Sequence, residues 1–163
     1  MKLQKLISKL EKHHKKKLDL SLGRTFNLLK KLGDPQDKLK NVITVVGTNA
    51  KASMCYSLKS ILNQTGHKTN LYTSPHLVSF TERYIFDDKE INEEDLIELL
   101  TDIEKTLGDD NATLFEILTC AFLKHAENFK DNINIIEAGL FHRFDSTNVF
   151  KGNLMTLIGV IHN

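Results

Sequence analysis

Seven residues in the first third of the chain have the composition of a loop that binds phosphate groups. Gly47-Thr48-Asn49-Ala50-Lys51-Ala52-Ser53 follows five apolar or β-branched residues and precedes a stretch whose apolar residues recur at helical spacing. A strand that leads through a turn into a helix can bind phosphates, because backbone N–H groups and the positive helix end converge there. Lys51 would contact the terminal phosphates, and the Ser53 hydroxyl would be a ligand for a bound metal ion.

Two features of this loop keep an alternative open. Its spacing is not that of the common G-x-x-x-x-G-K-[ST] loop, and Ala50 and Ala52 stand where flexible glycines would be expected. Taken alone, these residues are as compatible with an ordinary strand–loop–helix junction that carries a solvated lysine.

The elements around this loop alternate between strands and helices. Apolar patterns predict strands over 42–46, 69–73, 133–138 and 154–161, a small hairpin over 84–91, and helices over about 3–10, 26–32, 51–65, 93–107 and 113–129. This alternation predicts a doubly wound α/β fold with a mostly parallel sheet. Strand 154–161 is almost wholly apolar, so we expect a central parallel strand that is covered on both faces.

Several polar positions fall at the carboxyl ends of the predicted strands. They are the 47–53 loop, Ser74, the residues that follow Glu137, and His162. Doubly wound sheets bind their ligands at these strand ends. The convergence of the four positions is a stronger indication of a site than any one motif.

Composition is that of a globular protein with a single domain. The chain has 163 residues, of which 40% are apolar and 26% are charged. It contains no apolar run of about 18 residues that could span a membrane, and its basic N-terminus lacks the apolar core of a secretory signal. Cys55 and Cys120 fall in apolar helical stretches, so we expect buried free thiols in a cytoplasmic protein.

The small net charge of +1 hides an asymmetry along the chain. Residues 1–40 hold 12 Lys and Arg against 4 Asp and Glu, which leaves +8, and the remainder holds 10 against 17, which leaves −7. A basic segment can bind nucleic acid, but Phe26 is the only aromatic residue in this one. We therefore expect no nucleic-acid partner, and instead a solvated face or a face near an anionic small molecule.

Six short segments occur in the order, and near the spacing, of the motifs of one protein family. They are Leu22-Gly23-Arg24 for an L-G-x-x-R-like motif, 47–53 for G-T-N-G-K-G-S, 73–77 for T-S-P-H-L, Glu82-Arg83 for E-R, 113–119 for T-F-F-E-x-L-T, and 137–149 for E-V-G-L-G-G-R-x-D-A-T-N-V. On these residues the chain resembles the folylpolyglutamate synthase/dihydrofolate synthase family of the Mur ligase superfamily. The resemblance covers essentially all of the chain, but only the front part of proteins normally more than twice as long.

The resemblance implies an ATP-dependent amide ligase of folate biosynthesis. ATP would phosphorylate a carboxylate of dihydropteroate or of a folate, and the amine of L-glutamate would then attack the acyl phosphate. The 47–53 loop would hold the phosphates, with Mg²⁺ as cofactor and Ser74 and Glu137 among its ligands beside Ser53. For Glu137 the alternative is a buried carboxylate that pairs with Arg143.

The resemblance also implies a pocket for the pterin ring. Arg24, Thr113, Phe115 and Asp145 match family positions that line it, with an aromatic platform and a carboxylate for ring N–H groups. For Phe115 the alternative is plain core packing.

The chain departs from the family pattern at a few positions. Ala50 and Ala52 replace loop glycines, and a Cβ at a position that needs a positive φ costs about 1 kcal/mol or more. Phe141-His142 replaces a Gly-Gly pair beside the metal site. Either the two changes compensate each other or nucleotide binding is weakened. His162 lies close to the place of a metal-binding histidine, but the D-H pattern is not reached.

Residues 1–163 are therefore expected to be the N-terminal portion of the ATP-binding domain, without the C-terminal glutamate-binding domain. The chain alone should not complete catalysis, and the full-length protein is expected to be a monomer. The alternatives are another Mur-type acid–amino-acid ligase, a non-catalytic nucleotide- or folate-binding module, and a truncated product that does nothing alone.

Overall fold

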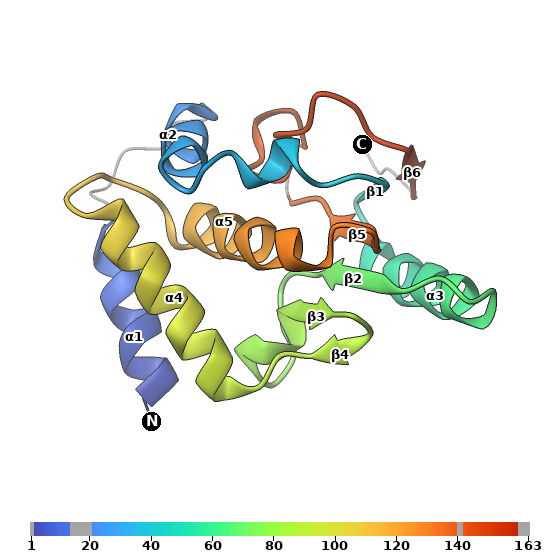
Figure 1. The fold of residues 1–163 in the computed structure, drawn as a ribbon, viewed down its shortest axis with the longest axis horizontal. Helices are drawn as coiled ribbons and strands as arrows, with labels where there is room; N and C mark the ends of the chain where they lie inside the picture. The colour runs from blue at the N-terminus through green and yellow to red at the C-terminus, as the bar shows by residue number, and fades with distance from the viewer. Residues whose placement is uncertain (1, 14–20, 140–141, 160–163) are drawn as a thin grey trace.

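The computed structural model describes residues 2–13, 21–139 and 142–159. Within these ranges, six strands form one sheet in the order β4-β3-β2-β5-β1-β6 (Figure 1). The strands are β1 (Val42–Val46), β2 (Thr69–Tyr72), β3 (Tyr84–Phe86), β4 (Lys89–Glu90), β5 (Ile133–Glu137) and β6 (Met155–Ile158). The α-helices are α1 (Lys2–Leu10), α2 (Gly23–Lys31), α3 (Lys51–Gln64), α4 (Glu93–Leu107) and α5 (Leu114–Ala126). None of the helices described is both long enough and apolar enough to cross a membrane.

The sheet is mostly parallel, as predicted. β2, β5, β1 and β6 run parallel to one another, and the hairpin of β3 and β4 joins the edge of β2 in the antiparallel direction. Helix α3 connects β1 to β2, and α4 and α5 lie between the hairpin and β5, so the α/β fold with a mostly parallel sheet is confirmed.

The two faces of the sheet carry separate cores, because successive strand residues point to opposite sides. Tyr72 and Ile136 belong to the larger core, which also contains residues of α1, α2, α4 and α5. Their strand neighbours Leu71 and Ile135 belong to a smaller core under α3. Figure 1 shows α3 apart from the other helices.

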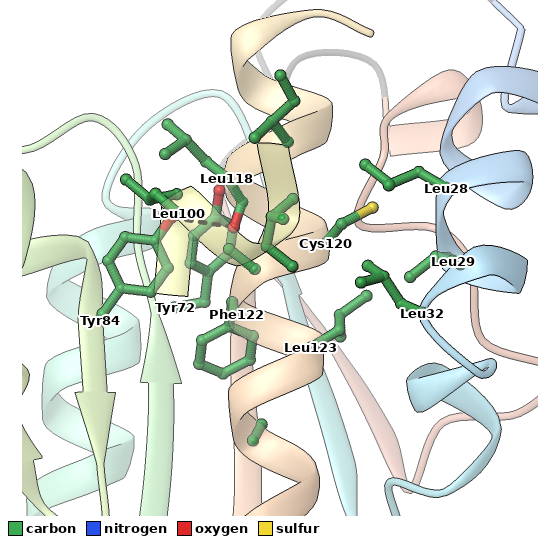
Figure 2. Close-up of a cluster of buried hydrophobic side chains, with 14 of the residues drawn as sticks. Leu28, Leu29, Leu32, Tyr72, Tyr84, Leu100, Leu118, Cys120, Phe122 and Leu123 are labelled. Atoms are coloured by element: carbon green, nitrogen blue, oxygen red, sulfur yellow. Dashed lines mark hydrogen bonds between the residues drawn. The ribbon is translucent and has the colours of Figure 1, made fainter. Parts of the chain in front are cut away.

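Helix α5 lies in the middle of the larger core, and Figure 2 shows it between the strand tyrosines and the leucines of α2. Its start is fixed by a capping box. The Thr113 hydroxyl accepts the Glu116 N–H at 3.1 Å, and the Glu116 carboxylate accepts the Thr113 N–H at 2.6 Å. The N-terminus of α5 is therefore a rigid support for the residues around it.

Turn and cap positions agree with the sequence. Asn92 caps α4, and Gly108 ends it with a φ of +62°. Gly66 follows α3 with a φ of +85°, as a C-terminal glycine should. Asp87 and Asp88, with φ values of 48° and 68°, form the tight turn of the predicted hairpin.

The predicted helix over 113–129 is shorter than expected. α5 ends at Ala126, and a 3-10 turn covers Glu127–Phe129. The ring of His125 packs against the rings of Phe86 and Phe129, with centroids 4.4 and 5.9 Å away. His125 is thus packed among aromatic residues.

The prediction that the last strand is central and covered was wrong. β6 lies at the edge of the sheet, where β1 is its partner. Leu154, Met155 and Ile158 are 62%, 47% and 67% exposed. An apolar run does not by itself give a strand's place in the sheet, and no described element covers the outer side of β6. Residues 160 and 161 of the predicted strand lie outside the described ranges.

Candidate active site

The loop after β1 takes a conformation that few residue types tolerate. Gly47 has a φ of +150°, and a Cβ built on it would lie 3.1 Å from the Cα of Gly159. Only glycine therefore fits where this loop passes the chain that leaves β6. Gly159 donates its N–H to the carbonyl of Val46 at 2.7 Å, which fixes that approach.

The two alanines of the loop differ in conformation. Ala50 is the N-cap of α3 and lies in the left-handed region, with φ 62° and ψ 8°. Its carbonyl accepts the N–H of Met54 at 2.9 Å, so the first turn of α3 is closed despite the Cβ. Ala52 lies inside the first turn of the helix and does not share this conformation. The expected cost of a Cβ therefore falls on Ala50 alone.

Lys51 and Ser53 lie in the first turn of α3, where orphan N–H groups and the positive end of the helix dipole meet. Lys51 is half-buried and Ser53 is exposed. The positive charge of Lys51 opposes the effect of burial on the Glu137 carboxyl and so lies within electrostatic reach of it.

Ser74 and Glu137 meet at the ends of neighbouring strands. Glu137 ends β5, pairs in register with Val45 of β1, and is 3% exposed. The backbone N–H of Ser74, two residues after β2, donates to Glu137 Oε2 at 2.9 Å. Burial raises the pKa of the Glu137 carboxyl, while this hydrogen bond and the charges of Lys51 and Arg83 lower it. A buried carboxylate is an oxygen ligand of the kind that a hard divalent cation such as Mg²⁺ prefers, and the Ser74 side chain would add a hydroxyl.

The alternative ion pair for Glu137 is not present. Arg143 is exposed, and its guanidinium lies over the ring of Phe144, 5.4 Å from the centroid. Of the salt bridges among the described residues, none joins Arg143 to Glu137. The buried carboxylate is therefore not held by that arginine.

The segment after Ser74 is braced by its own side chains. The Glu82 carboxylate accepts the backbone N–H groups of Leu77, Val78 and Ser79 at 2.7, 3.0 and 2.8 Å, and these bonds lower its pKa. Arg83 donates from Nε to His76 Nδ1 at 2.9 Å. The loop between β2 and β3 thus has a defined shape, although Leu77 and Val78 at its tip are 93% and 89% exposed.

Arg83 is a site residue that the sequence analysis did not assign. Its guanidinium lies 5.2 Å from the centroid of the Phe80 ring, and its charge acts on the Glu137 carboxyl. The E-R motif was the available signal, but a motif does not show which strand end an arginine side chain reaches.

Phe115 and Asp145 come together around Gly139. A Cβ built on Gly139 would lie 2.1 Å from Asp145 Oδ2 and 3.2 Å from Phe115 Cε1. Gly139 follows β5, two residues after Glu137, so this second group of predicted residues lies beside the first. The Phe115 ring is half-buried and stacks on Tyr72 at a centroid distance of 6.3 Å. Phe115 therefore contacts the core, as its alternative interpretation required, and keeps part of its surface exposed.

Asp145 is held in a tight turn. Its carboxylate Oδ1 accepts the N–H of Thr147 at 2.9 Å and the Thr147 hydroxyl, and its carbonyl accepts the N–H of Asn148 at 2.8 Å. The side chain is buried, with 8% exposed. Its orientation is consequently set by the chain that follows it.

Arg24 and Thr113 lie on the same side of the fold as Phe115, at the N-terminus of α5. Arg24 Nε donates to both carboxylate oxygens of Glu116, at 3.2 and 3.1 Å, and Nη2 donates to Oε1 at 3.0 Å. The hydroxyl of Thr113 caps the helix. The structure brings Arg24 and Thr113 together at Glu116, a residue without a role in the prediction, and their place in a pterin pocket stays a prediction.

The described cysteines and histidines give little support for a nucleophilic thiol or a metal site. Cys55 and Cys120 are buried and free, and burial raises the pKa of Cys55 to about 12 and that of Cys120 further. Neither thiol is therefore a nucleophile at neutral pH. No trio of His, Cys, Asp or Glu side chains that could hold a metal ion occurs within the described ranges. Phe141 and His162 lie outside them, and His142 begins a 3-10 turn that ends at Phe144.

Comparison with known proteins points to one family, although no protein-family model matches the chain. Over 154 residues, the chain is 34% identical to the dihydrofolate synthase/folylpolyglutamate synthase of Escherichia coli, covering 94% of this chain and 36% of that protein. Over 145 residues, it is 34% identical to the dihydrofolate synthetase of Saccharomyces cerevisiae, covering 88% of this chain and 34% of that protein.

Solved structures agree with the sequence comparison. Escherichia coli FolC in complex with DHPP and ADP superposes with a TM-score of 0.87 at 35% identity, over 96% of this chain and 37% of that one. The Yersinia pestis bifunctional enzyme complexed with AMPPNP and a Mn ion gives a TM-score of 0.87 at 31% identity, over 96% of this chain and 38% of that one.

The chain thus spans little more than a third of the length of these relatives. Across that length it shares their sequence and their fold, and it matches the N-terminal part of the dihydrofolate synthase/folylpolyglutamate synthase family.

Proposed function

We propose that this chain carries the nucleotide- and pterin-binding part of an ATP-dependent amide ligase that adds L-glutamate to dihydropteroate, to folates, or to both. The observation that carries the proposal is the 2.9 Å contact between the Ser74 N–H and Glu137 Oε2, next to the loop that opens α3. In the proposed site, the Ser74 hydroxyl, the buried Glu137 carboxylate and the N-terminus of α3 would face one ligand position at the carboxyl ends of β2, β5 and β1.

In the proposed reaction, a substrate carboxylate attacks the terminal phosphorus of ATP, and ADP leaves. The glutamate amine then attacks the acyl phosphate, releases inorganic phosphate and forms the amide. Both steps need neutralised phosphate charge and fixed geometry more than a nucleophilic side chain. The Gly47–Lys51 turn would bind the phosphates through backbone N–H groups, and Lys51 would hold the terminal one.

Metal binding would fall to Ser74 and Glu137, with Ser53 at the exposed start of α3 as a third oxygen donor. Mg²⁺ bound there would supply charge neutralisation for the phosphates. Arg83, which acts on the Glu137 carboxyl, would add positive charge on the same side.

The acid substrate would bind on the side of Phe115 and Asp145. The half-exposed face of Phe115 would stack on a pterin ring, and Asp145 would accept its N–H groups. Arg24 and Thr113 would act mainly by fixing the start of α5, because both already bond to Glu116. Escherichia coli FolC, to which this chain is similar, was solved in complex with both DHPP and ADP, which supports a protein that binds a nucleotide and a second small molecule.

The experiment that tests the proposal has two stages. Mg-ATP and dihydropteroate are first titrated separately into the chain by calorimetry, and both are expected to bind. The full-length protein is then assayed for ADP release that requires both glutamate and a pteroate or folate substrate. Absence of such release with either class of acid would overturn the proposal.

One observation favours a second candidate, a folate-binding module without nucleotide turnover. The Cβ of Ala50 stands in the left-handed N-cap of α3, where phosphates would approach the backbone. Binding of dihydropteroate without any binding of Mg-ATP would select this candidate over the ligase.

The free cysteines and the ion pairs of the basic first segment support proposals about the protein's cellular location and partners. We propose a protein of the cytoplasm, since both cysteines are free and buried, and a monomer when full length. We also propose that it has no nucleic-acid partner, because lysines of the basic first segment pair with acidic residues elsewhere. These pairs are Lys9–Glu104, Lys31–Asp110 and Lys38–Glu127.

A further inference from the structure

Three buried hydroxyl groups form a chain through the middle of the molecule. The phenol of Tyr72 lies 3.2 Å from Thr119 Oγ1, and Thr119 Oγ1 lies 2.9 Å from Ser146 Oγ. The three residues are 0%, 1% and 3% exposed. We call Tyr72, Thr119 and Ser146 the hydroxyl bridge. It crosses from β2 through α5 to the turn that holds Asp145.

Each end of the hydroxyl bridge attaches to one half of the candidate site. Tyr72 is the last residue of β2, two positions before Ser74, which contacts Glu137. Its ring also stacks on Phe115. Ser146 directly follows Asp145 in the turn closed by Thr147 and Asn148. The bridge therefore ties the metal-side strand end to the carboxylate of the pterin side.

Thr119 is the middle residue of the hydroxyl bridge, so both contacts of the bridge depend on it. Thr119 is fixed on the rigid helix α5, and its single hydroxyl serves both neighbours. Burial raises the pKa of Tyr72 far above its ordinary value, so the phenol stays protonated and can donate. Hydroxyl groups linked in this way polarise one another, and an unpaired polar group in such a buried site is costly.

The Ser146 hydroxyl is the end member of the hydroxyl bridge and contacts Thr119 alone within it. Removing that hydroxyl leaves Thr119 its bond to Tyr72. A change at Ser146 should therefore loosen the Asp145 turn without unfolding the core around α5.

We propose that Ser146, acting through Thr119, is a positioning residue that sets the orientation of Asp145 for the acid substrate. The proposal rests on the proposed function, because it presumes that Asp145 faces a pterin. It assigns no contact between Ser146 and the ligand. Its consequence is specific: loss of the bridge weakens binding of the acid and leaves binding of the nucleotide unchanged.

The test compares four proteins by calorimetry with dihydropteroate and with Mg-ATP. Ser146→Ala removes one bond of the bridge, Thr119→Val removes both while keeping the side-chain shape, and Thr119→Ser keeps the hydroxyl. Ser57→Ala, on an exposed face of α3, is the matched control. We expect dihydropteroate affinity to fall about three- to tenfold in Ser146→Ala and about tenfold or more in Thr119→Val. Thr119→Ser and Ser57→Ala should bind like the wild type.

A second measurement separates positioning from general damage. Hydrogen exchange at the amides of Thr147 and Asn148 should be faster in Ser146→Ala, while exchange in α3 stays unchanged. Equal losses for both ligands, or no loss for dihydropteroate, would overturn the inference and leave the proposed function standing. If the wild-type chain binds neither ligand, the proposed function fails first, and the inference fails with it.

Discussion

The two ends of the parallel strands carry polar residues of opposite character. At the amino ends, Asn70 and Asn134 are fully buried, and Asn70 Nδ2 donates to Asn134 Oδ1 at 2.9 Å. Asn134 Nδ2 donates to the carbonyl of Lys40 at 2.9 Å, and Asn132 Nδ2 donates to Asn70 Oδ1 at 3.1 Å. These amides satisfy one another, so the cluster is complete without a ligand.

At the carboxyl ends, Glu137 is just as deeply placed but is less well compensated. Its pKa is raised by burial, in spite of the Ser74 N–H and two nearby cations. A bound divalent cation would offset that desolvation, whereas the asparagine cluster has nothing to gain from one. This difference is the one expected between polar residues that maintain the fold and a polar residue that has the proposed role in binding a ligand.

The largest change in stability is expected from a substitution in the asparagine cluster at the amino ends of the strands. Asn134→Ala leaves the amide of Asn70 and the carbonyl of Lys40 without their partner, so the free energy of unfolding should fall by about 2–3 kcal/mol. Urea unfolding measures this loss, and Asn128→Ala at an exposed position is the control. Stability equal to that of the wild type would show that the cluster does not support the fold.

At the carboxyl ends of the strands, substitution of Glu137 is expected to change stability by less and in the opposite direction. Because the pKa of Glu137 is raised above its ordinary 4.5, the folded chain binds more protons than the unfolded chain as pH rises from 4.5 toward the folded pKa. The free energy of unfolding should therefore decrease with pH across that window. Glu137→Gln removes the charge, so it should flatten this decline and be at least as stable as the wild type at pH 7. Urea unfolding between pH 4 and 8 measures both; a variant less stable at pH 7 would contradict the comparison.

Replacing each of the two loop alanines by glycine should change the free energy of unfolding in opposite directions. Ala50→Gly relieves the left-handed φ and should raise the free energy of unfolding by about 0.5–1 kcal/mol after the extra freedom of glycine in the unfolded chain is subtracted. Ala52→Gly, in the helical turn, should lower it by up to about 1 kcal/mol. Thermal unfolding of both variants checks the signs; two changes of the same sign would refute this account of the loop.

The smallest effect concerns His76. Burial, and next the charge of Arg83, lower its pKa below 6.5, so the folded chain binds fewer protons than the unfolded chain just below that pH. Stability contributed by this residue should therefore rise with pH up to about 6.5. Protonation of Nδ1 would also remove the acceptor for Arg83 Nε. An NMR titration should give a midpoint below 6.5, and a midpoint at or above 6.5 would contradict the arrangement of this loop.

The sequence predicted much of the arrangement at the carboxyl ends of the strands. It predicted little of the arrangement at the amino ends. Strand periodicity placed Ser74 and Glu137 at the ends of parallel strands, and parallel strands bring such ends to one edge. The regular geometry of a parallel sheet therefore carried the prediction, and the structure brings the two residues into contact. Asn70 and Asn134 read as ordinary polar residues within strands, because their bond joins positions 64 residues apart.

Other features also depend on distant pairing that no local pattern encodes. Arg24 and Glu116 are 92 residues apart in sequence, and the hydroxyl bridge joins three separate elements. The place of β6 at the sheet edge likewise follows from strand order, whereas its apolar composition suggested the centre. The sequence predicted that a Cβ in the loop is costly only at a position with a positive φ. The backbone shows that Ala50 has such a φ and that Ala52 does not.

The most direct test of the central claim is a calorimetric titration of ATP, with and without Mg²⁺, into the wild-type chain, Glu137→Gln and Asn134→Ala. The account predicts that Mg²⁺ strengthens ATP binding at least tenfold in the wild type and in Asn134→Ala, and that Glu137→Gln loses this enhancement. Equal enhancement in Glu137→Gln, or none in the wild type, would contradict it.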